Sequence, residues 1–95
     1  MIRHIVFFSA GRPADIEPIR ERLSDLGRIP HSQRFEVSLN RKSDLYGNEI
    51  DIVVYAEFAD EAALAAYKAH PIYAATTAVV KPMRDIRVAA DIDVT

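Results

Sequence analysis

The spacing of apolar residues along the chain predicts four β-strands. Residues 2–9 and 50–58 carry β-branched or aromatic side chains on both of their alternating faces, which is typical of strands covered on both sides. Residues 35–39 and 86–94 alternate apolar and polar side chains, the period of two expected of a half-buried strand. Breaker residues, including Gly11, Pro13 and Gly47, lie between these segments.

Two further segments show the spacing of amphipathic helices. Between residues 16 and 26, isoleucine and leucine recur every three or four positions, and Gly27 and Pro30 then end the predicted helix. The second helix begins after Asp60, whose carboxylate can cap its first turn. Because Pro71 lacks an amide hydrogen and disfavours a helical conformation at His70, this helix is expected to stop or kink there and to restart toward residue 80.

The order of these elements, β-α-β-β-α-β, predicts an α+β protein with a ferredoxin-like fold. In this arrangement two helices pack on one face of a four-stranded antiparallel sheet and leave the other face open. Yet Ile5, Phe7, Val53 and Tyr55 are expected to point to the open face from the two central strands. An apolar patch of this kind marks an interaction surface, so we expect a homodimer in which two sheets stack face to face.

The composition is that of an ordinary globular protein, with 49% hydrophobic and 27% charged residues. No linker divides the chain, so residues 1–95 are expected to form a single domain. The net charge of −2 comes from dispersed acidic and basic residues, which argues against a nucleic-acid partner. The absence of cysteine removes disulfides and thiolate chemistry. The apolar N-terminal run is too short for a signal peptide or a membrane span, so we expect a soluble, cytoplasmic protein without a membrane partner.

Four short motifs together resemble the stress-responsive A/B barrel domain family, known as Dabb. They are the opening IRHIVFF at residues 2–8, Ile29-Pro30 after the first helix, DIVVYAEFAD at residues 51–60, and YKAHP at residues 67–71. The resemblance spans nearly the whole chain, and the motifs occur in the family's order and at its separations. It implies a dimeric α/β barrel built from ferredoxin-like subunits, which agrees with the fold predicted from the residues.

The resemblance leaves activity open, because the family includes plant stress-responsive proteins, a polyketide cyclase and bacterial proteins of unassigned role. In the cyclising type the pocket lies between sheet and helices, and the catalytic tyrosine would fall on Tyr67. Its catalytic histidine would fall on Tyr73, and a further pocket histidine would fall on Ile52. Of these catalytic groups the chain therefore keeps only the tyrosine, Tyr67. His4 is the one histidine that remains to face the pocket.

His4 is the residue best suited to acid or base chemistry, because imidazole titrates near neutral pH. It shares a strand face with Val6 and Phe8, so it is expected to line a cavity beneath the helices within reach of Tyr67 and Tyr73. The simpler alternative is a histidine at the edge of the core that hydrogen-bonds one of those tyrosines. The two tyrosines suit either core packing or ligand contact.

The rest of this cavity is expected to be mainly apolar. The candidate ligand-binding residues are Val6, Phe8, Ile52, Val54 and His70. For His70 a structural role is the stronger interpretation, since a donor NH at the end of a helix can satisfy free carbonyl groups there.

Metal binding has little support in the sequence. His31 and His70 are remote from each other, and Asp91 with Asp93 lies on a predicted exposed strand where solvated charge is the simpler interpretation. We expect no metal site and no cofactor. The resemblance adds one alternative, a divalent cation held by backbone carbonyl groups, which would map to Leu26, Ile29 and Ser32.

Three functional hypotheses stay open. The first is a dimeric protein that binds a small apolar or aromatic ligand in the helix–sheet cavity. The second is a cofactor-independent, polyketide-cyclase-like enzyme in which His4 acts with Tyr67 or Tyr73. The third is a structural stress-response protein without catalytic activity. Space for a ligand beneath Tyr67 is the observation that separates them.

Overall fold

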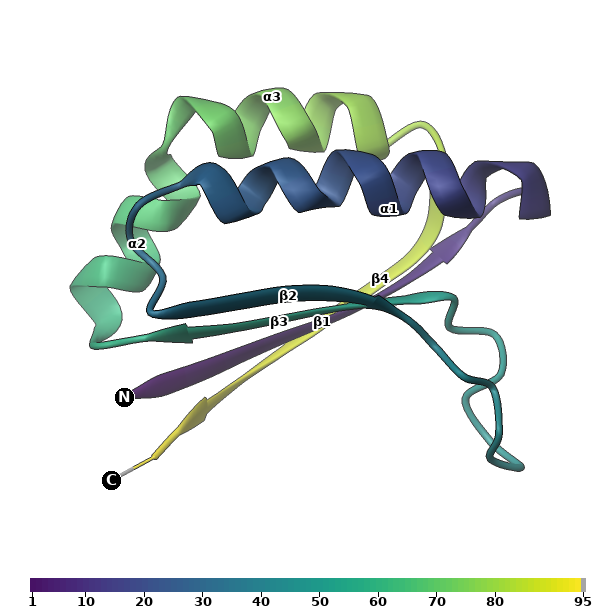
Figure 1. Cartoon of the computed structure of the whole chain (residues 1–95), viewed down its shortest axis with the longest axis horizontal. Helices are drawn as coiled ribbons and strands as arrows, with labels where there is room; N and C mark the ends of the chain where they lie inside the picture. The colour runs from purple at the N-terminus through teal and green to yellow at the C-terminus, as the bar shows by residue number, and fades with distance from the viewer. Residues whose placement is uncertain (95) are drawn as a thin grey trace.

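A computed structural model describes residues 1–94, and Thr95 lies outside them. The main elements, in chain order, are β1 (Ile2–Ala10), α1 (Ile16–Ser24), β2 (Arg34–Leu39), β3 (Ile52–Phe58), α2 (Glu61–Ala69), α3 (Pro71–Val80) and β4 (Arg84–Asp93). Short 3₁₀ turns, η1 (Pro13–Asp15) and η2 (Asp25–Arg28), flank α1. The strands form one antiparallel sheet in the order β2-β3-β1-β4, and all three helices cover the same face (Figure 1). Among the described residues, no helix has the length and apolarity needed to span a membrane.

The predicted α+β, ferredoxin-like arrangement is confirmed. The sheet of the single chain is open, with β2 and β4 at its edges. Two strand boundaries differ from the prediction by two residues, and three others by one. β3 begins two residues late, because the amide of Ile50 is used in a turn with the carbonyl of Gly47, at 3.1 Å. β4 begins two residues early, because Arg84 pairs with Ala10 beyond an irregularity in β1.

The hydrophobic core lies between the sheet and the helices. In β3, Ile52, Val54, Ala56 and Phe58 are buried, while the residues between them point to the other face and are half-buried. Full burial of a large apolar side chain contributes roughly 1.5–3 kcal/mol to folding. The helices contribute the buried side chains Ile19, Leu23, Leu64, Tyr67 and Val80.

The helix that follows β3 is broken at the predicted position. Asp60 caps α2 by accepting a hydrogen bond from the amide of Ala63, at 2.9 Å. At His70 the backbone becomes extended, with φ −69° and ψ 142°, and Pro71 starts α3. The Nδ1 atom of His70 accepts a hydrogen bond from the amide of Ile72, at 3.1 Å. The predicted capping role of His70 is confirmed, but its ring caps the start of α3 as an acceptor instead of donating to carbonyl groups at the end of α2.

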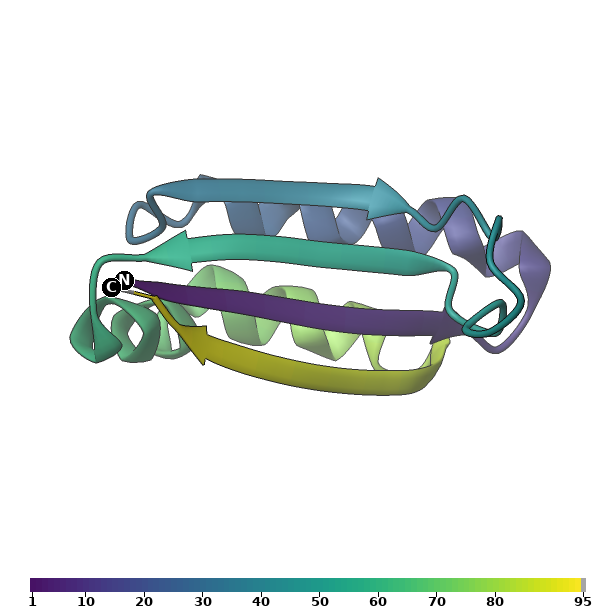
Figure 2. The same ribbon diagram turned by 90° about the horizontal axis from the view of Figure 1, so that it is seen from below.

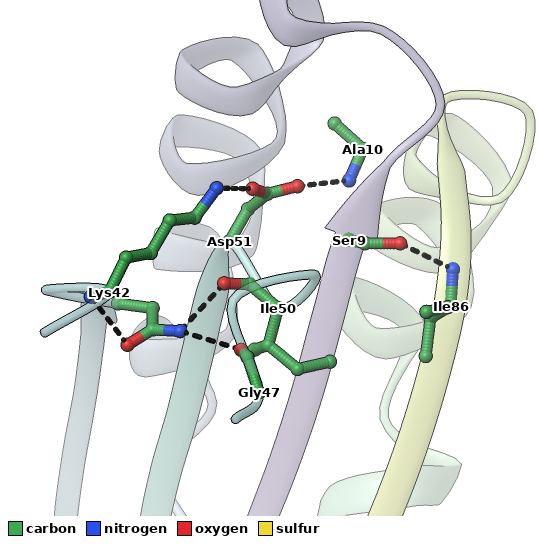
Figure 3. Close-up of polar contacts among 8 residues, drawn as sticks. Ser9, Ala10, Lys42, Gly47, Ile50, Asp51 and Ile86 are labelled. Atoms are coloured by element: carbon green, nitrogen blue, oxygen red, sulfur yellow. Dashed lines mark hydrogen bonds and ion pairs between the residues drawn. The ribbon is translucent and has the colours of Figure 1, made fainter. Parts of the chain in front are cut away.

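The loop between β2 and β3 is held at its base by hydrogen bonds from a single side chain (Figure 3). The side-chain amide of Asn40 donates to the carbonyl oxygens of Gly47 and Ile50, at 3.1 and 2.8 Å. Its oxygen accepts from the amide of Lys42, at 3.1 Å. Lys42 has a positive φ of 56°, a conformation that this local contact supports.

Asp51 ties the end of the same loop to β1 (Figure 3). Its buried carboxylate accepts from the amide of Ala10, at 2.8 Å, and from Nζ of Lys42, at 2.5 Å. Burial alone would raise the pKa of Asp51. The hydrogen bonds from Lys42 and Ala10 outweigh burial, so the pKa of Asp51 lies below its ordinary value.

The sheet face opposite the helices is uncovered in the single chain (Figure 2). Ile5 pairs with Tyr55 and Phe7 pairs with Val53 on this face, as the alternation predicts. Phe7 is 38% exposed, and Val88 on the neighbouring β4 is 56% exposed. The apolar patch predicted from the sequence is therefore present at the surface.

Candidate functional site

His4 lies inside the protein on the helix-facing side of β1. The alternation of β1 places it beside Val6 and Phe8, and it is only 1% exposed. Its ring meets those of Phe58 and Tyr67 edge to face, with ring centroids 6.2 Å apart in both pairs. A titratable imidazole is thus enclosed largely by aromatic and aliphatic side chains.

The partner of His4 is a carboxylate on the edge strand of the sheet. His4 and Asp91 occupy directly opposed positions of β1 and β4, and Nδ1 of His4 lies 2.5 Å from Oδ1 of Asp91. The side chain of Asp91 is 41% exposed, so the pair connects the interior with solvent. The expectation that His4 bonds a tyrosine is wrong, and so is the interpretation of Asp91 as merely solvated charge.

This pairing fixes which ring nitrogen of His4 is available for chemistry. An ionised Asp91 accepts from Nδ1–H, so it favours the neutral tautomer in which Nε2 carries no proton. A carboxylate in this position also stabilises the imidazolium that forms when Nε2 takes up a proton, the role it has in other histidine–carboxylate pairs. The pairing thus leaves Nε2 of His4 as the ring nitrogen that can accept a proton or a hydrogen bond.

Two tyrosines from the helices stand next to His4. Tyr67 of α2 is 1% exposed, and its ring packs against that of Tyr73 of α3, with centroids 5.3 Å apart. Burial raises the pKa of Tyr67 above its ordinary value, and the charge of Arg87 acts weakly in the opposite direction. Tyr67 is therefore a hydrogen-bond donor at neutral pH and a poor base. Tyr73 accepts a hydrogen bond from Nη2 of Arg87, at 3.4 Å.

These residues surround a narrow cavity between the helices and the sheet. The centre of a water molecule can occupy about 20 Å³ of it, which is room for roughly one water. About 370 Å³ of space without protein atoms lies in and around the cavity, and this figure includes open solvent at the mouth. The cavity in this structure is thus too small for an aromatic ligand. Binding of such a ligand requires movement of the helices or of side chains at the mouth. Its lining consists of His4, Val6, Phe8, Leu23, Leu26, Val54, Tyr67, Tyr73, Thr76, Thr77, Val80, Arg84 and Arg87.

Most of the residues expected at the cavity from the sequence lie there. His4, Tyr67 and Tyr73 line it, as do Val6, Phe8 and Val54. Ile52 and His70 do not belong to the lining. Ile52 is fully buried at the start of β3, where it pairs with Phe8 and Leu39. His70 lies outside the cavity because it caps α3.

The structure adds two kinds of residue that sequence reasoning missed. The first kind comprises Asp91 and Arg87 of β4. Alternation alone indicates that they share a face of the strand with Ala89. The sequence carries no signal, however, for the antiparallel register that sets Asp91 opposite His4. Thr76 of α3 is the second kind, a buried polar side chain in a helix of mainly apolar residues. Such a residue in a buried helix face is the available signal for a polar site.

His31 and His70 are brought together by the fold, with ring centroids 6.3 Å apart. Within residues 1–94, however, no group of three or more histidine, aspartate or glutamate side chains has the arrangement needed to hold a metal ion. The carbonyl of Leu26 is one of the three groups to which the alternative cation site would map. It accepts a hydrogen bond from the amide of Ile29, at 3.2 Å.

The chain is thus a ferredoxin-like α+β protein with a narrow cavity between helices and sheet. The model of the family described as Stress responsive A/B Barrel Domain (Dabb) matches residues 2–94. The chain therefore belongs to the Dabb family, as its motifs indicated. No curated protein is significantly similar to the chain in sequence.

Solved structures support the fold. A dimeric ferredoxin-like protein of unknown function from Thermobifida fusca YX is 28% identical, with a TM-score of 0.82 over 98% of this chain and 90% of that one. A Dabb family protein from Mesorhizobium loti MAFF303099 is 23% identical, with a TM-score of 0.79 over 99% of this chain and 96% of that one. A putative antibiotic biosynthesis monooxygenase from Nitrosomonas europaea is 18% identical, with a TM-score of 0.76 over 98% and 97%. The last two likenesses concern the fold alone.

Proposed function

We propose that this chain binds a small apolar or aromatic molecule in the helix–sheet cavity and that His4 moves a proton on that molecule without a cofactor. The observation that carries the proposal is the pair that His4, which lines the mainly apolar cavity, forms with Asp91 on the neighbouring strand. A buried imidazole needs a hydrogen-bond partner for its N–H in any case, but an ionisable partner also stabilises the protonated form of the ring. Clusters of titratable groups in apolar cavities are typical of sites that handle protons.

The chemistry assigned to the site is a reversible proton transfer. Nε2 of His4 takes a proton from an acidic C–H or O–H group of the ligand, and Asp91 stabilises the resulting imidazolium. Tyr67, which stays protonated, donates a hydrogen bond to the oxygen on which negative charge develops. The proton then returns to another atom of the ligand. A positioned base of this kind contributes roughly 10²–10⁴-fold to a rate.

The position of the catalytic base differs from that in the cyclising type of Dabb protein. Tyr73 stands where that type has its catalytic histidine, and it contacts Arg87 instead of acting as a base. In this chain the base falls on His4, across the cavity on β1. We therefore infer an isomerisation or ring-closing reaction whose reacting atom faces the sheet.

A purely structural role is the second candidate function, and the small volume of the cavity favours it. In that case the His4–Asp91 pair stabilises the edge of the sheet and assembly is the function. The two candidates differ in the movement of the helices. Only the first requires the helices to move apart so that a ligand can enter the cavity.

We also propose that two copies associate through the open sheet faces to form the dimeric α/β barrel. The apolar residues Ile5, Phe7, Val53 and Tyr55 support this, as does the description of the T. fusca neighbour as dimeric. Covering such a patch is the usual reason for an apolar sheet face at a surface.

The β2–β3 loop supports the same dimer. It projects to the side of the open face, away from the helices (Figure 1). Its tip carries Leu45 and Tyr46, which are 87% and 85% exposed. Tyr46 also borders a shallow groove of about 270 Å³ with Phe7 and Val53. We infer that the second copy covers this groove and the tip of the loop.

The proposed ligand site is tested by screening small aromatic and aliphatic compounds by thermal shift. Compounds that stabilise the wild type are then compared on His4→Gln and on a control, His31→Gln, which replaces a histidine outside the cavity. The proposal predicts that stabilisation is weakened in His4→Gln and kept in His31→Gln. An equal response in all three proteins would exclude His4 from the site.

A further inference from the structure

We propose that the cavity selects ligands carrying a carboxylate and that Arg87, with Arg84 beside it, is the residue that recognises this group. The inference rests on the proposed function, because it names the class of molecule that the same cavity takes. The ligand is accordingly an aromatic or similarly apolar carboxylic acid, held by its anionic end at β4 and by its apolar body beneath α1 and α3.

The position of the two arginines carries the first step. Arg84 and Arg87 both lie on β4, are half-buried and contribute to the lining of the cavity. Arg87 lies opposite Phe8 of β1, a buried residue of the same cavity. These side chains therefore bring positive charge to a site whose other walls are mainly apolar.

The second step is that this charge has no carboxylate partner in the protein. Within residues 1–94, neither Arg84 nor Arg87 takes part in an ion pair. Of the acidic residues with the same alternation on β4, Asp91 is engaged with His4, and Asp85 and Asp93 are exposed without an ion pair to either arginine in this described part of the chain. A half-buried guanidinium without an anion retains its donors for a ligand, and its planar fork matches a carboxylate in a bidentate geometry.

The third step concerns the contact that Arg87 does make. Its Nη2 donates to the hydroxyl of Tyr73 at 3.4 Å, which is at the long end of hydrogen-bond distances. A charge-assisted bond to a carboxylate is shorter and roughly twice as strong. An anionic ligand can therefore replace this contact at little cost and separate Tyr73 from Arg87. That movement widens the mouth of a cavity which otherwise holds about one water.

The arrangement along β4 also orients the ligand. Arg87 and Asp91 lie on the same face of the strand four positions apart, which corresponds to roughly 13 Å of strand. Arg87 contacts Tyr73, the ring of Tyr73 packs against that of Tyr67, and the ring of Tyr67 meets that of His4. A carboxylate bound by Arg87 therefore directs the far end of a ligand of one or two rings toward His4.

Two matched pairs of probes test the inference: benzoate with benzamide, and 2-naphthoate with 2-naphthamide. Each acid is compared with the neutral amide of the same shape by isothermal titration calorimetry at low ionic strength. The wild type is expected to bind the acid of at least one pair about tenfold to a hundredfold more tightly than the amide. Arg87→Gln is expected to lose this preference while it keeps the affinity for the amide. Arg87→Lys, which keeps the charge without the fork, is expected to retain part of it.

Arg28→Gln is the control, because Arg28 is exposed on η2 outside the cavity and the variant should behave as the wild type. Equal affinities of the wild type for acid and amide, or a preference that survives in Arg87→Gln, would overturn the inference and leave the proposed ligand site standing. Binding of no probe to the wild type would contradict both. Circular dichroism of each variant shows that a lost preference does not come from unfolding.

Discussion

Nδ1 of His4 and Oδ1 of Asp91 lie 2.5 Å apart on opposed positions of β1 and β4. The two residues are 87 positions apart in the sequence, and only the antiparallel closure of the sheet brings them together. One of them is almost fully buried, and the other reaches solvent. The proton transfer proposed for His4 rests on this relationship.

Removal of the carboxylate is expected to change the tautomer of His4. In Asp91→Ala, Nδ1 loses its acceptor, and we expect ¹⁵N NMR to show the ring proton shifted from Nδ1 toward Nε2. Asp91→Asn keeps an acceptor oxygen and should retain the wild-type tautomer. Because a buried donor is left without a partner, Asp91→Ala should also lower the free energy of unfolding by roughly 1–3 kcal/mol.

Asp93→Ala is the control for this experiment, since Asp93 is exposed on the same strand. A His4 tautomer that is identical in the wild type and in Asp91→Ala would contradict the role given to Asp91.

Tyr67 is expected to stay protonated at a pH where an ordinary tyrosine ionises. Burial raises its folded-state pKa above the unfolded value of about 10, so the folded state disfavours the phenolate. The free energy of unfolding should therefore fall as the pH rises above about 10, and it should fall less in Tyr67→Phe. The measurement is urea unfolding at several alkaline pH values. Parallel pH dependence in both proteins would show that Tyr67 ionises normally.

Asp51 is expected to make the fold sensitive to acid. Its folded-state pKa lies below the unfolded value of about 3.9, so its stabilising contribution is present above that value and is lost as the pH falls through the folded-state pKa. Urea unfolding between pH 7 and pH 2 should show this loss in the wild type. Asp51→Asn should be less stable at pH 7 by about 2 kcal/mol and should depend less on pH.

The exposed Asp85 provides the control for the acid experiment, and Asp85→Asn should follow the wild type. The role of Asp51 would be refuted by an unchanged pH dependence in Asp51→Asn.

The open face of the sheet is expected to hold the dimer together. Phe7 lies on this face and Val79 lies on α3, and both are 38% exposed, so they form a matched pair. Phe7→Glu should raise the dimer dissociation constant at least about thirtyfold, because it places a charge at the centre of the apolar patch. Val79→Glu should leave it unchanged. Sedimentation velocity at micromolar concentration measures both, and a monomeric wild type would contradict the dimer.

Most of the fold was predictable because alternation and helical spacing are local. The break at Pro71 and the cap at Asp60 were predictable for the same reason. The strand β4 shows where local patterns fail. Its apolar residues Val88 and Ile92 point away from the helices, and the polar residues of β4 point to the helix side.

The site was predictable only in part, because it depends on contacts between distant segments. Alternation placed His4 on the correct side of β1, but its partner depends on the register between β1 and β4. The acceptor role of His70 depends on which helix its ring turns toward, and both nitrogen roles are chemically allowed. The cavity volume depends on side-chain packing, which no periodicity encodes.

The central claim is that the cavity beside His4 opens to a small molecule. The most direct measurement is a ¹H–¹⁵N and methyl NMR titration with the aromatic acids and amides named above. We predict that saturable shifts are confined to the cavity residues, with Val6, Val54 and Thr76 among them, and include the imidazole of His4. Shifts confined to the open sheet face, or no saturable shift at all, would contradict the claim and favour the structural role.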